Sequence, residues 1–183
     1  NRIHQEADRL GALINDILRL SQLDEGGALP HEQVSVLELA QEAVRSLTAQ
    51  AAAQAVHISV TGTAGTVFGV RRLLYEIARN LCENAVKYNV PGGSVTVEVA
   101  ETDRDVTLLV RDTGIGIPEG DQSRVFERFY RVDKSHSRAI GGTGLGLSIV
   151  KHAVAYHHGT LRLESQPGKG TVITVTLPKE PTE

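Results

Sequence analysis

The segment SVTVEVAETDRDVTLLVRDT, residues 94–113, decides the fold of this chain. Apolar and polar residues alternate in residues 94–102 and again in residues 105–113, and a short charged turn separates the two runs. Alternation with a period of two is the pattern of a strand that buries one face. Two such runs joined by a short turn predict an antiparallel β-hairpin.

The segments on either side of the hairpin predict further strands and several helices. Helices are predicted at residues 35–54, at residues 70–89, and from the glycines of residues 141–146 to about His158. Strands are predicted at residues 56–62, 65–69, 160–166 and 170–177. Most adjacent strands are joined by tight turns. This favours an α+β fold with an antiparallel or mixed sheet and helices on one face over a doubly wound parallel sheet.

The first 24 residues have the pattern of a helix from a coiled coil or bundle. Ile3, Leu10 and Ile17 recur at intervals of seven, and charged residues occupy the opposite face. The partner of this stripe is another chain, an upstream helix or the domain that follows. Ser35, with Glu38 three residues later, predicts the N-cap of the next helix. The predicted organisation is a bundle-type helix at residues 1–27, a linker at 28–34 and a main domain at 35–180.

Composition limits the classes of function. The 183 residues carry a net charge of −3 and few aromatic residues, which disfavours a nucleic-acid-binding surface. Cys82 is the one cysteine, so an intramolecular disulfide and a cysteine-rich zinc site are excluded, and a reducing cytoplasmic setting is expected. No apolar run approaches the roughly 20 residues of a membrane-spanning helix. We expect a soluble fragment of a longer protein, without direct membrane contact.

Four polar residues share one face of the helix predicted at residues 70–89. Asn80 and Asn84 are four residues apart, Glu76 lies one turn before them, and Lys87 lies one turn after. Amide oxygens are acceptable ligands for Mg²⁺, and a lysine can bind phosphate oxygens. The alternative is a solvated polar stripe without a ligand.

A second candidate site follows the hairpin. Asp112 ends the predicted strand, and Gly114 and Gly116 allow the backbone to bend tightly behind it. A carboxylate there can accept a hydrogen bond from an amino group such as that of adenine. The alternative is an Asp-Thr-Gly turn that binds nothing.

The segment from residue 118 to residue 146 is polar, basic and rich in glycine. Its aromatic residues are interleaved with Arg131 and Arg138, as in a solvated basic loop or in a lid that brings positive charge to a phosphate. Gly142, Gly144 and Gly146 fit neither the dinucleotide-binding fingerprint nor a P-loop. They predict a hinge that opens a helix whose N-terminal amides can bind an anion.

Four motifs in this order resemble those of sensor histidine kinases. NLCENAVKY at 80–88, DTGIGI at 112–117, VFERFYRVD at 125–133 and GGTGLGLSIVK at 141–151 look like the N, G1, F and G2 boxes of that family. The family belongs to the GHKL ATPases, which include DNA gyrase. The resemblance implies a two-layer α/β sandwich in which a mixed sheet packs on three helices and ATP lies between helices and lid. Residues 1–24 resemble the second helix of the dimerisation and phosphoacceptor hairpin.

The resemblance also implies residue roles. Asn80 and Asn84 would ligate Mg²⁺ on the triphosphate, and Lys87 and Tyr88 would contact phosphate or ribose. Asp112 would accept the adenine amine. The other residues expected around the nucleotide are Gly114, Gly116 and Ile117 at the base, Arg131 and Arg138 at the γ-phosphate, and Gly142, Thr143, Gly144, Leu145 and Gly146 around the phosphates. The intact protein would be a membrane-anchored homodimer that passes its phosphoryl group to a response regulator.

One departure from the family concerns the phosphoacceptor. The family's His-Glu pair lies on the first hairpin helix, which this sequence lacks. His31 and Glu32 imitate the pair but follow the second helix, so we interpret His31 as a solvated linker residue. His157 and His158 are expected to lie favourably at a helix C-terminus. A GHKL ATPase that uses Glu76 to activate water is the alternative function, and a nucleotide-sensing module is a third.

Overall fold

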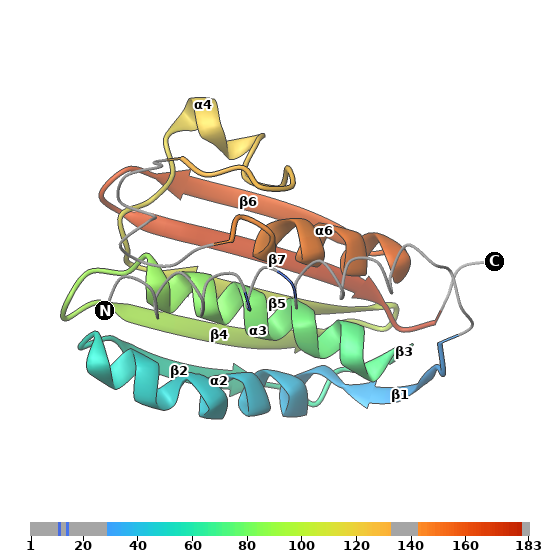
Figure 1. Cartoon of the computed structure of the whole chain (residues 1–183). Coiled ribbons are helices and arrows are strands. Elements are labelled where there is room, and N and C mark those ends of the chain that lie inside the picture. The colour runs from blue at the N-terminus through green and yellow to red at the C-terminus, as the bar shows by residue number, and fades with distance from the viewer. Residues whose placement is uncertain (1–10, 12–13, 15–28, 133–142, 181–183) are drawn as a thin grey trace.

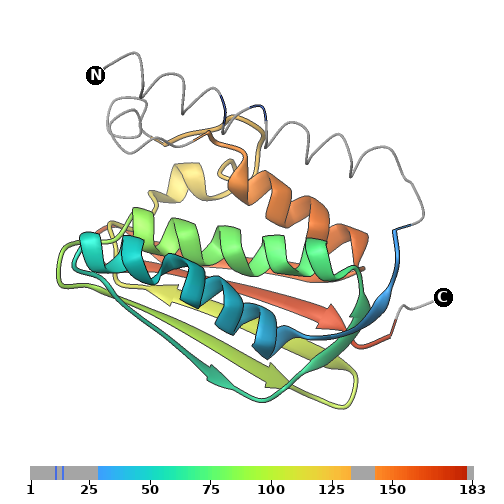
Figure 2. The same ribbon diagram turned by 60° about the horizontal axis from the view of Figure 1, so that its bottom comes forward.

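A computed structural model describes residues 11, 14, 29–132 and 143–180 of the chain. The elements are β1 (Glu32–Ser35), α2 (Val36–Ala53), β2 (His57–Gly62), β3 (Thr66–Gly69), α3 (Arg71–Lys87), β4 (Ser94–Glu101), β5 (Asp105–Asp112), α4 (Glu119–Gln122), α6 (Gly146–Tyr156), β6 (Thr160–Gln166) and β7 (Gly170–Pro178). The order of the five-stranded sheet is β2-β4-β5-β7-β6, and α2, α3 and α6 cover one of its faces (Figures 1 and 2). The predicted α+β, two-layer fold is confirmed. The bundle-type helix predicted at residues 1–27 lies outside the described residues, apart from residues 11 and 14.

The hairpin predicted at residues 94–113 is confirmed as β4 and β5. Val97 pairs with Val110 and Val99 with Leu108 in an antiparallel register, and these side chains are buried beneath the helices. β2 runs parallel to β4 instead. The chain between these two strands contains α3, so it crosses over the sheet before it returns, and a crossover connection joins parallel strands. This one parallel pair makes the sheet mixed.

The structure corrects the prediction of a linker at residues 28–34, because part of this segment is a strand. Glu32–Ser35 form β1, which pairs antiparallel with β3 as a separate two-stranded sheet. Val34 is 1% exposed and is the residue through which this short strand reaches the core. A four-residue strand with one inward apolar side chain has too little alternation to be recognised from sequence. The linker is therefore part of the folded domain from Glu32 onward.

The helices bury their apolar faces against the sheet and against one another. Ser35 caps α2, as predicted: its Oγ accepts a hydrogen bond from Glu38 N at 3.3 Å. α3 lies between α2 and α6 (Figure 2) and carries Ile77, Leu81 and other fully buried residues. Cys82 is also buried, and desolvation raises the pKa of its thiol to about 12. The thiol therefore stays protonated and unreactive at neutral pH.

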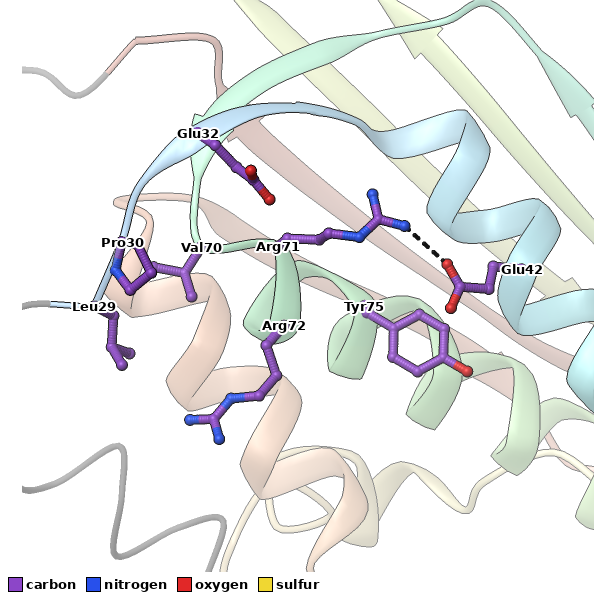
Figure 3. Close-up of a pocket in the computed structure, with 8 residues that line it drawn as sticks. All are labelled: Leu29, Pro30, Glu32, Glu42, Val70, Arg71, Arg72 and Tyr75. Atoms are coloured by element: carbon purple, nitrogen blue, oxygen red, sulfur yellow. Dashed lines mark hydrogen bonds and ion pairs between the residues drawn. The ribbon is translucent and has the colours of Figure 1, made fainter.

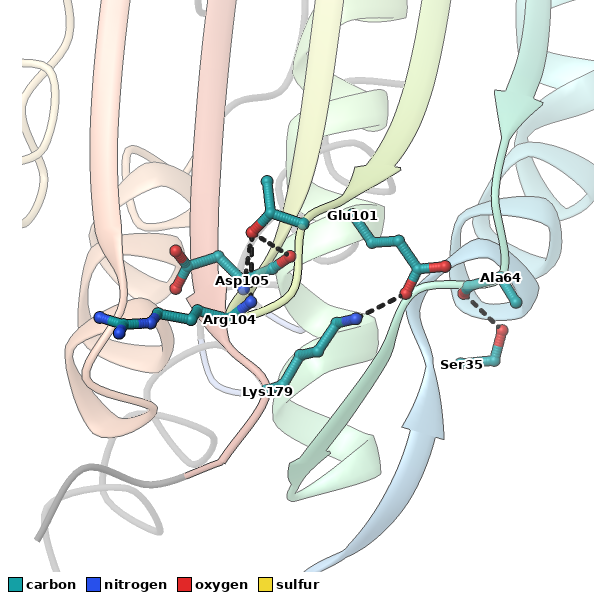
Figure 4. A network of polar contacts seen from close by, with 7 residues as sticks. Ser35, Ala64, Glu101, Arg104, Asp105 and Lys179 are labelled. Carbon is teal, nitrogen blue, oxygen red and sulfur yellow. Dashed lines mark hydrogen bonds and ion pairs between the residues drawn. The ribbon is translucent and has the colours of Figure 1, made fainter.

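Polar contacts close the end of the sheet where β4 turns into β5 (Figure 4). Lys179 Nζ lies 2.9 Å from Glu101 Oε2, and Thr102 Oγ1 accepts a hydrogen bond from Asp105 N at 3.0 Å. Ser35 Oγ donates to Ala64 O at 3.0 Å. The ion pair is partly exposed, so it contributes little stability; its position fixes where β7 ends beside the hairpin.

His157 connects the end of α6 to the start of α3. Its Nε2 accepts a hydrogen bond from Val70 N at 3.0 Å, and its Nδ1 lies 2.7 Å from Ala153 O. These two bonds require a neutral ring with the proton on Nδ1. Burial lowers the pKa of His157, while the bond to Ala153 O acts in the opposite direction. His157 lies at the C-terminus of α6 as expected, but its ring is buried and neutral, so it does not act there as a cation.

We predict that stability falls as the pH drops below the pKa of about 6.5 that a histidine has in the unfolded chain. The folded pKa of His157 is lower, so over this range the unfolded chain binds a proton that the folded chain does not, and unfolding becomes easier. Urea unfolding at pH 7.5 and 5.5 measures the loss. His157→Gln should show a smaller loss than the wild type, whereas exposed His57→Gln should keep the wild-type loss. An equal loss in the wild type and His157→Gln would contradict the assignment.

Candidate functional site

The polar stripe of α3 faces the N-terminus of α6. Asn80 Nδ2 donates hydrogen bonds to Glu76 O at 2.8 Å and to Glu76 Oε2 at 3.2 Å. These bonds fix the amide so that its oxygen points away from Glu76, and a Cβ at Gly146 would lie 3.0 Å from that oxygen. Glu76 is 9% exposed. Glu76 is thus buried while Asn80, Asn84 and Lys87 are partly exposed, and the amide oxygen of Asn80 is directed towards the start of α6.

Asn84 lies one turn further along α3, close to the same point. A Cβ at Gly146 would lie 3.8 Å from Asn84 Nδ2. α6 begins at Gly146, so the first amides of that helix, which have no partner within the helix, lie beside the two asparagines. A helix N-terminus carries partial positive charge. The amide oxygen of Asn80 and an anion-binding helix end thus meet at one place.

Asp112 is held in place by two backbone amides. Its Oδ1 accepts hydrogen bonds from Gly114 N at 2.8 Å and from Thr171 N at 3.2 Å. Burial raises the pKa of the carboxyl, and the two amide bonds lower it. Both bonds use the same oxygen, and no partner for Oδ2 is recorded among the described residues. The second oxygen is thus the one that can accept a hydrogen bond from a ligand.

The glycines after Asp112 pack against neighbouring backbone. A Cβ at Gly114 would lie 2.3 Å from Tyr88 O, and a Cβ at Gly116 would lie 2.1 Å from Gln166 O. Gly116 also has a φ of +69°, which side chains with a Cβ rarely adopt. These two positions require glycine because the loop passes close to the end of α3 and to the end of β6.

Two nitrogens of the Arg131 guanidinium group are buried. Its Nε and Nη2 have no hydrogen-bond partner among the described residues. Burial raises the pKa of the Tyr88 phenol, and the positive charge of Arg131 acts in the opposite direction. Lys87 Nζ lies 5.9 Å from the centre of the Tyr88 ring. A buried donor without a partner is costly, and an anion bound beside Tyr88 would remove that cost.

The glycine-rich segment is described from Thr143 onward. Thr143 Oγ1 accepts a hydrogen bond from Leu145 N at 3.3 Å, and Gly144 O accepts one from Phe129 N at 2.9 Å. Leu145 is fully buried. Gly144 has a φ of +75°. Arg138 and Gly142 lie outside the described residues, and their roles stay predictions.

Three side chains around Asp112 were not predicted from the sequence: Ser165, Thr171 and Gln122. Ser165 Oγ accepts a hydrogen bond from Ile117 N at 2.8 Å, which accounts for the position of Ile117. Thr171 is buried beside Asp112, to which its N donates. The sequence signal for this region is the pair of glycines in PGKG, residues 167–170, a pattern that by itself predicts a turn between two strands.

A cavity of about 480 Å³ lies elsewhere, at the start of α3 (Figure 3). It is lined by Leu29, Pro30, Glu32, Glu42, Val70, Arg71, Arg72 and Tyr75. Arg71 Nη2 forms an ion pair with Glu42 Oε2 at 3.0 Å across it. None of the predicted site residues lines this cavity. The site around Asp112, Arg131 and Gly146 is therefore separate from it.

Comparison with known proteins identifies a family and relatives of this chain. A family model described as histidine kinase-, DNA gyrase B- and HSP90-like ATPase matches residues 69–181. The sensor-like histidine kinase SenX3 of Mycolicibacterium smegmatis is 43% identical over 180 residues, which are 96% of this chain and 46% of that protein. The chain thus spans about half the length of this relative.

Two solved structures have the same fold. The mycobacterial sensor histidine kinase MprB superposes with a TM-score of 0.72 at 33% identity, covering 84% of this chain and 100% of that one. A full-length ShkA structure in complex with AMPPNP gives a TM-score of 0.81 at 26% identity, covering 94% of this chain and 36% of that one.

We predict that Gly116→Ala lowers the free energy of unfolding by about 1–3 kcal/mol, because alanine at φ +69° is strained and its Cβ would clash with Gln166 O. Gly120→Ala is the matched control. It lies in α4 with no atom near its added Cβ, and its effect should stay within about 0.5 kcal/mol. Urea denaturation followed by circular dichroism measures both. Equal stability of the two variants would contradict the packing described for the loop.

Proposed function

We propose that this chain, which belongs to the histidine kinase-, DNA gyrase B- and HSP90-like ATPase family, is the ATP-binding catalytic part of a two-component sensor histidine kinase. The observation that carries the proposal is the pair of buried Arg131 nitrogens, Nε and Nη2, that have no hydrogen-bond partner among the described residues. A triphosphate would supply the missing acceptors. The two asparagines of α3 and the first amides of α6 lie where further phosphate oxygens and their counter-ion could bind.

We assign Asp112 as the residue that binds the base of the nucleotide. The carboxylate uses Oδ1 for the two backbone amides, so Oδ2 would accept a hydrogen bond from the exocyclic amine of adenine. Burial strengthens such a bond because water does not compete for the oxygen. Ile117 and the glycines around it form the loop that positions this carboxylate. Asp112 therefore selects a base that carries an amino group.

Magnesium is assigned to Asn80 and Asn84. Their amide oxygens are hard ligands, which suit this ion, and Glu76 holds the Asn80 amide by accepting from its Nδ2. Among the described residues no group of three or more His, Cys, Asp or Glu side chains could form a metal cage. An ion held by two amides and by phosphate oxygens fits this donor set. When bound, the ion would neutralise charge on the triphosphate.

The chain's own residues would position the γ-phosphoryl group for in-line transfer. Lys87 and Arg131 would neutralise the charge that spreads over its oxygens, and Arg138 is assigned the same task. The accepting atom is a ring nitrogen of a histidine on a hairpin helix that this sequence does not include. The bond from the γ-phosphorus to the bridging oxygen breaks, the bond to nitrogen forms, and ADP leaves.

The phosphoryl group would pass from the histidine to an aspartate on the receiver domain of a response regulator. We assign the intact protein as a homodimer through its hairpin helices and as anchored in a membrane by segments beyond this chain. In residues 29–132 and 143–180, no helix has the length and apolar character that a membrane span needs.

The second candidate function is hydrolysis of ATP by a GHKL-type ATPase. The observation that favours it is the buried carboxylate of Glu76, which lies one turn before Asn80 and accepts a hydrogen bond from Asn80 Nδ2 at 3.2 Å. A carboxylate in that position could accept a proton from an attacking water. The two candidates differ in the acceptor of the phosphoryl group.

We predict that the chain, extended upstream to restore the first hairpin helix, becomes phosphorylated when it is mixed with Mg²⁺ and ATP labelled at the γ-phosphate. The label should be acid-labile, as expected of a phosphohistidine. Asn84→Ala should reduce labelling by at least about tenfold because it removes a ligand of the ion. Rapid release of free phosphate without labelled protein would contradict the kinase and support the ATPase.

We predict that Arg131→Met raises stability and lowers the affinity for Mg-ATP. Methionine removes the cost of burying unpartnered donors, so the free energy of unfolding should rise by about 1 kcal/mol. Affinity for Mg-ATP should fall at least about tenfold because a charge-assisted bond to phosphate is lost. Thermal unfolding and titration calorimetry measure the two effects, and exposed Arg104→Met is the control. Unchanged affinity would contradict the role of Arg131.

A further inference from the structure

We propose that Ser165, the residue before the last of β6, is a positioning residue that holds the Asp112 carboxylate and the loop after it in the arrangement that binds the nucleotide base. The inference rests on the proposed function and extends it to a residue outside the four motifs. It follows from the hydrogen bonds that converge on one hydroxyl group.

The Ser165 hydroxyl joins three segments of backbone. Its Oγ accepts a hydrogen bond from Ile117 N at 2.8 Å, donates to Gly170 O at 3.0 Å, and lies 2.8 Å from Thr171 Oγ1. A hydroxyl has one proton to donate and two lone pairs to accept. Since the proton goes to Gly170 O, the Thr171 hydroxyl must donate to Ser165. All three bonding capacities of the Ser165 hydroxyl are then used.

The same hydroxyl also positions the Thr171 amide, which is the second hydrogen-bond donor to Asp112. Thr171 N donates to Asp112 Oδ1 at 3.2 Å, and Ser165 holds Thr171 by its side chain and Gly170 by its carbonyl. A Cβ at Gly170 would lie 2.0 Å from Asp112 O, so the start of β7 also touches the Asp112 backbone. Loss of the hydroxyl therefore releases the amide of Thr171 from Asp112.

A second side chain ties the same segments together. Gln122 Nε2 donates to Ser165 O at 2.9 Å and to Ile117 O at 3.0 Å. Gln122 belongs to α4, where Asp121 also accepts a hydrogen bond from the Tyr130 hydroxyl, next to Arg131. The base end of the site and the segment that carries Arg131 are thus connected through the residues around Ser165.

The pKa of Asp112 reports on this arrangement. Burial raises it, and the amide bonds from Gly114 and Thr171 lower it. Two titratable residues are close to this region in the sequence: Arg111 in β5 and Lys169 in the β6–β7 turn. Both side chains are exposed. Tyr88, at the end of α3, contacts the loop through its backbone oxygen. Loss of the Thr171 bond should therefore move the pKa of Asp112 upward.

The test compares Ser165→Ala with Ser59→Ala, because both serines are half-buried and lie in edge strands of the sheet. The dissociation constant of a non-hydrolysable ATP analogue is measured with Mg²⁺ by calorimetry between pH 5 and 8. Ser165→Ala should weaken binding about tenfold at pH 7.5. It should also raise the pH at which binding is half lost, since binding needs the ionised Asp112. Ser165→Thr, which keeps the hydroxyl, should restore both values.

Two further variants make each outcome decisive. If Asp112→Asn weakens binding but Ser165→Ala binds like the wild type at every pH, the inference is overturned and the proposed function stands. If the wild type fails to bind, or Asp112→Asn binds as well as the wild type, the proposed function fails and the inference with it. If Ser165→Ala only loses thermal stability, with no shift of the pH profile, Ser165 is structural and the inference is overturned. Ser59→Ala should match the wild type throughout.

Discussion

The hydrogen bonds to Asp112 Oδ1 join parts of the chain that are 59 residues apart. One comes from Gly114 N in the loop after β5, and the other comes from Thr171 N at the start of β7. β7 lies between β5 and β6 in the sheet. The Asp112 carboxylate therefore holds the end of β5 against the start of β7 and the β6–β7 turn. The glycines of both segments then allow close approach of the backbones, and Ser165 completes the contact.

The other half of the site depends on the packing of α6 along α3. His157 fixes one end of that packing through Val70 N, and Gly146 lies against Asn80 at the other end. Several features of the site and its surroundings cost stability: a neutral buried histidine, a buried carboxylate and two buried Arg131 nitrogens without partners among the described residues. Features of this kind persist in functional sites because a ligand or a defined geometry compensates for them.

Much of the fold follows from local patterns in the sequence. The β4–β5 hairpin, the N-cap at Ser35 and the position of Asn80 and Asn84 on one helical face each depend on residues close together in the chain, so periodicity and capping rules predict them. β1 is not predictable in this way, since Val34 alone carries its inward face. The neutral state of His157 and the bonds of Ser165 depend on residues distant in sequence, so only the folded structure reveals them.

The site residues likewise divide into those that local sequence patterns indicate and those that only the folded structure reveals. The four motifs led to Asp112, Arg131 and the glycines without reference to a structure, because each motif is continuous in the sequence. The structure adds the direction in which each group points. Glu76 turns the Asn80 amide towards α6, Asp112 keeps one oxygen available, and Arg131 has two buried donors without partners among the described residues. The proposed ATP site rests on these directions more than on the residue types.

A structure of the chain with Mg²⁺ and a non-hydrolysable ATP analogue tests the central claim most directly. The account predicts that the Arg131 guanidinium binds a phosphate oxygen, that Asp112 Oδ2 accepts a hydrogen bond from the adenine amine, and that Asn84 contacts the ion. A nucleotide bound in the cavity beside Tyr75, or one that leaves Arg131 without a partner, would contradict it.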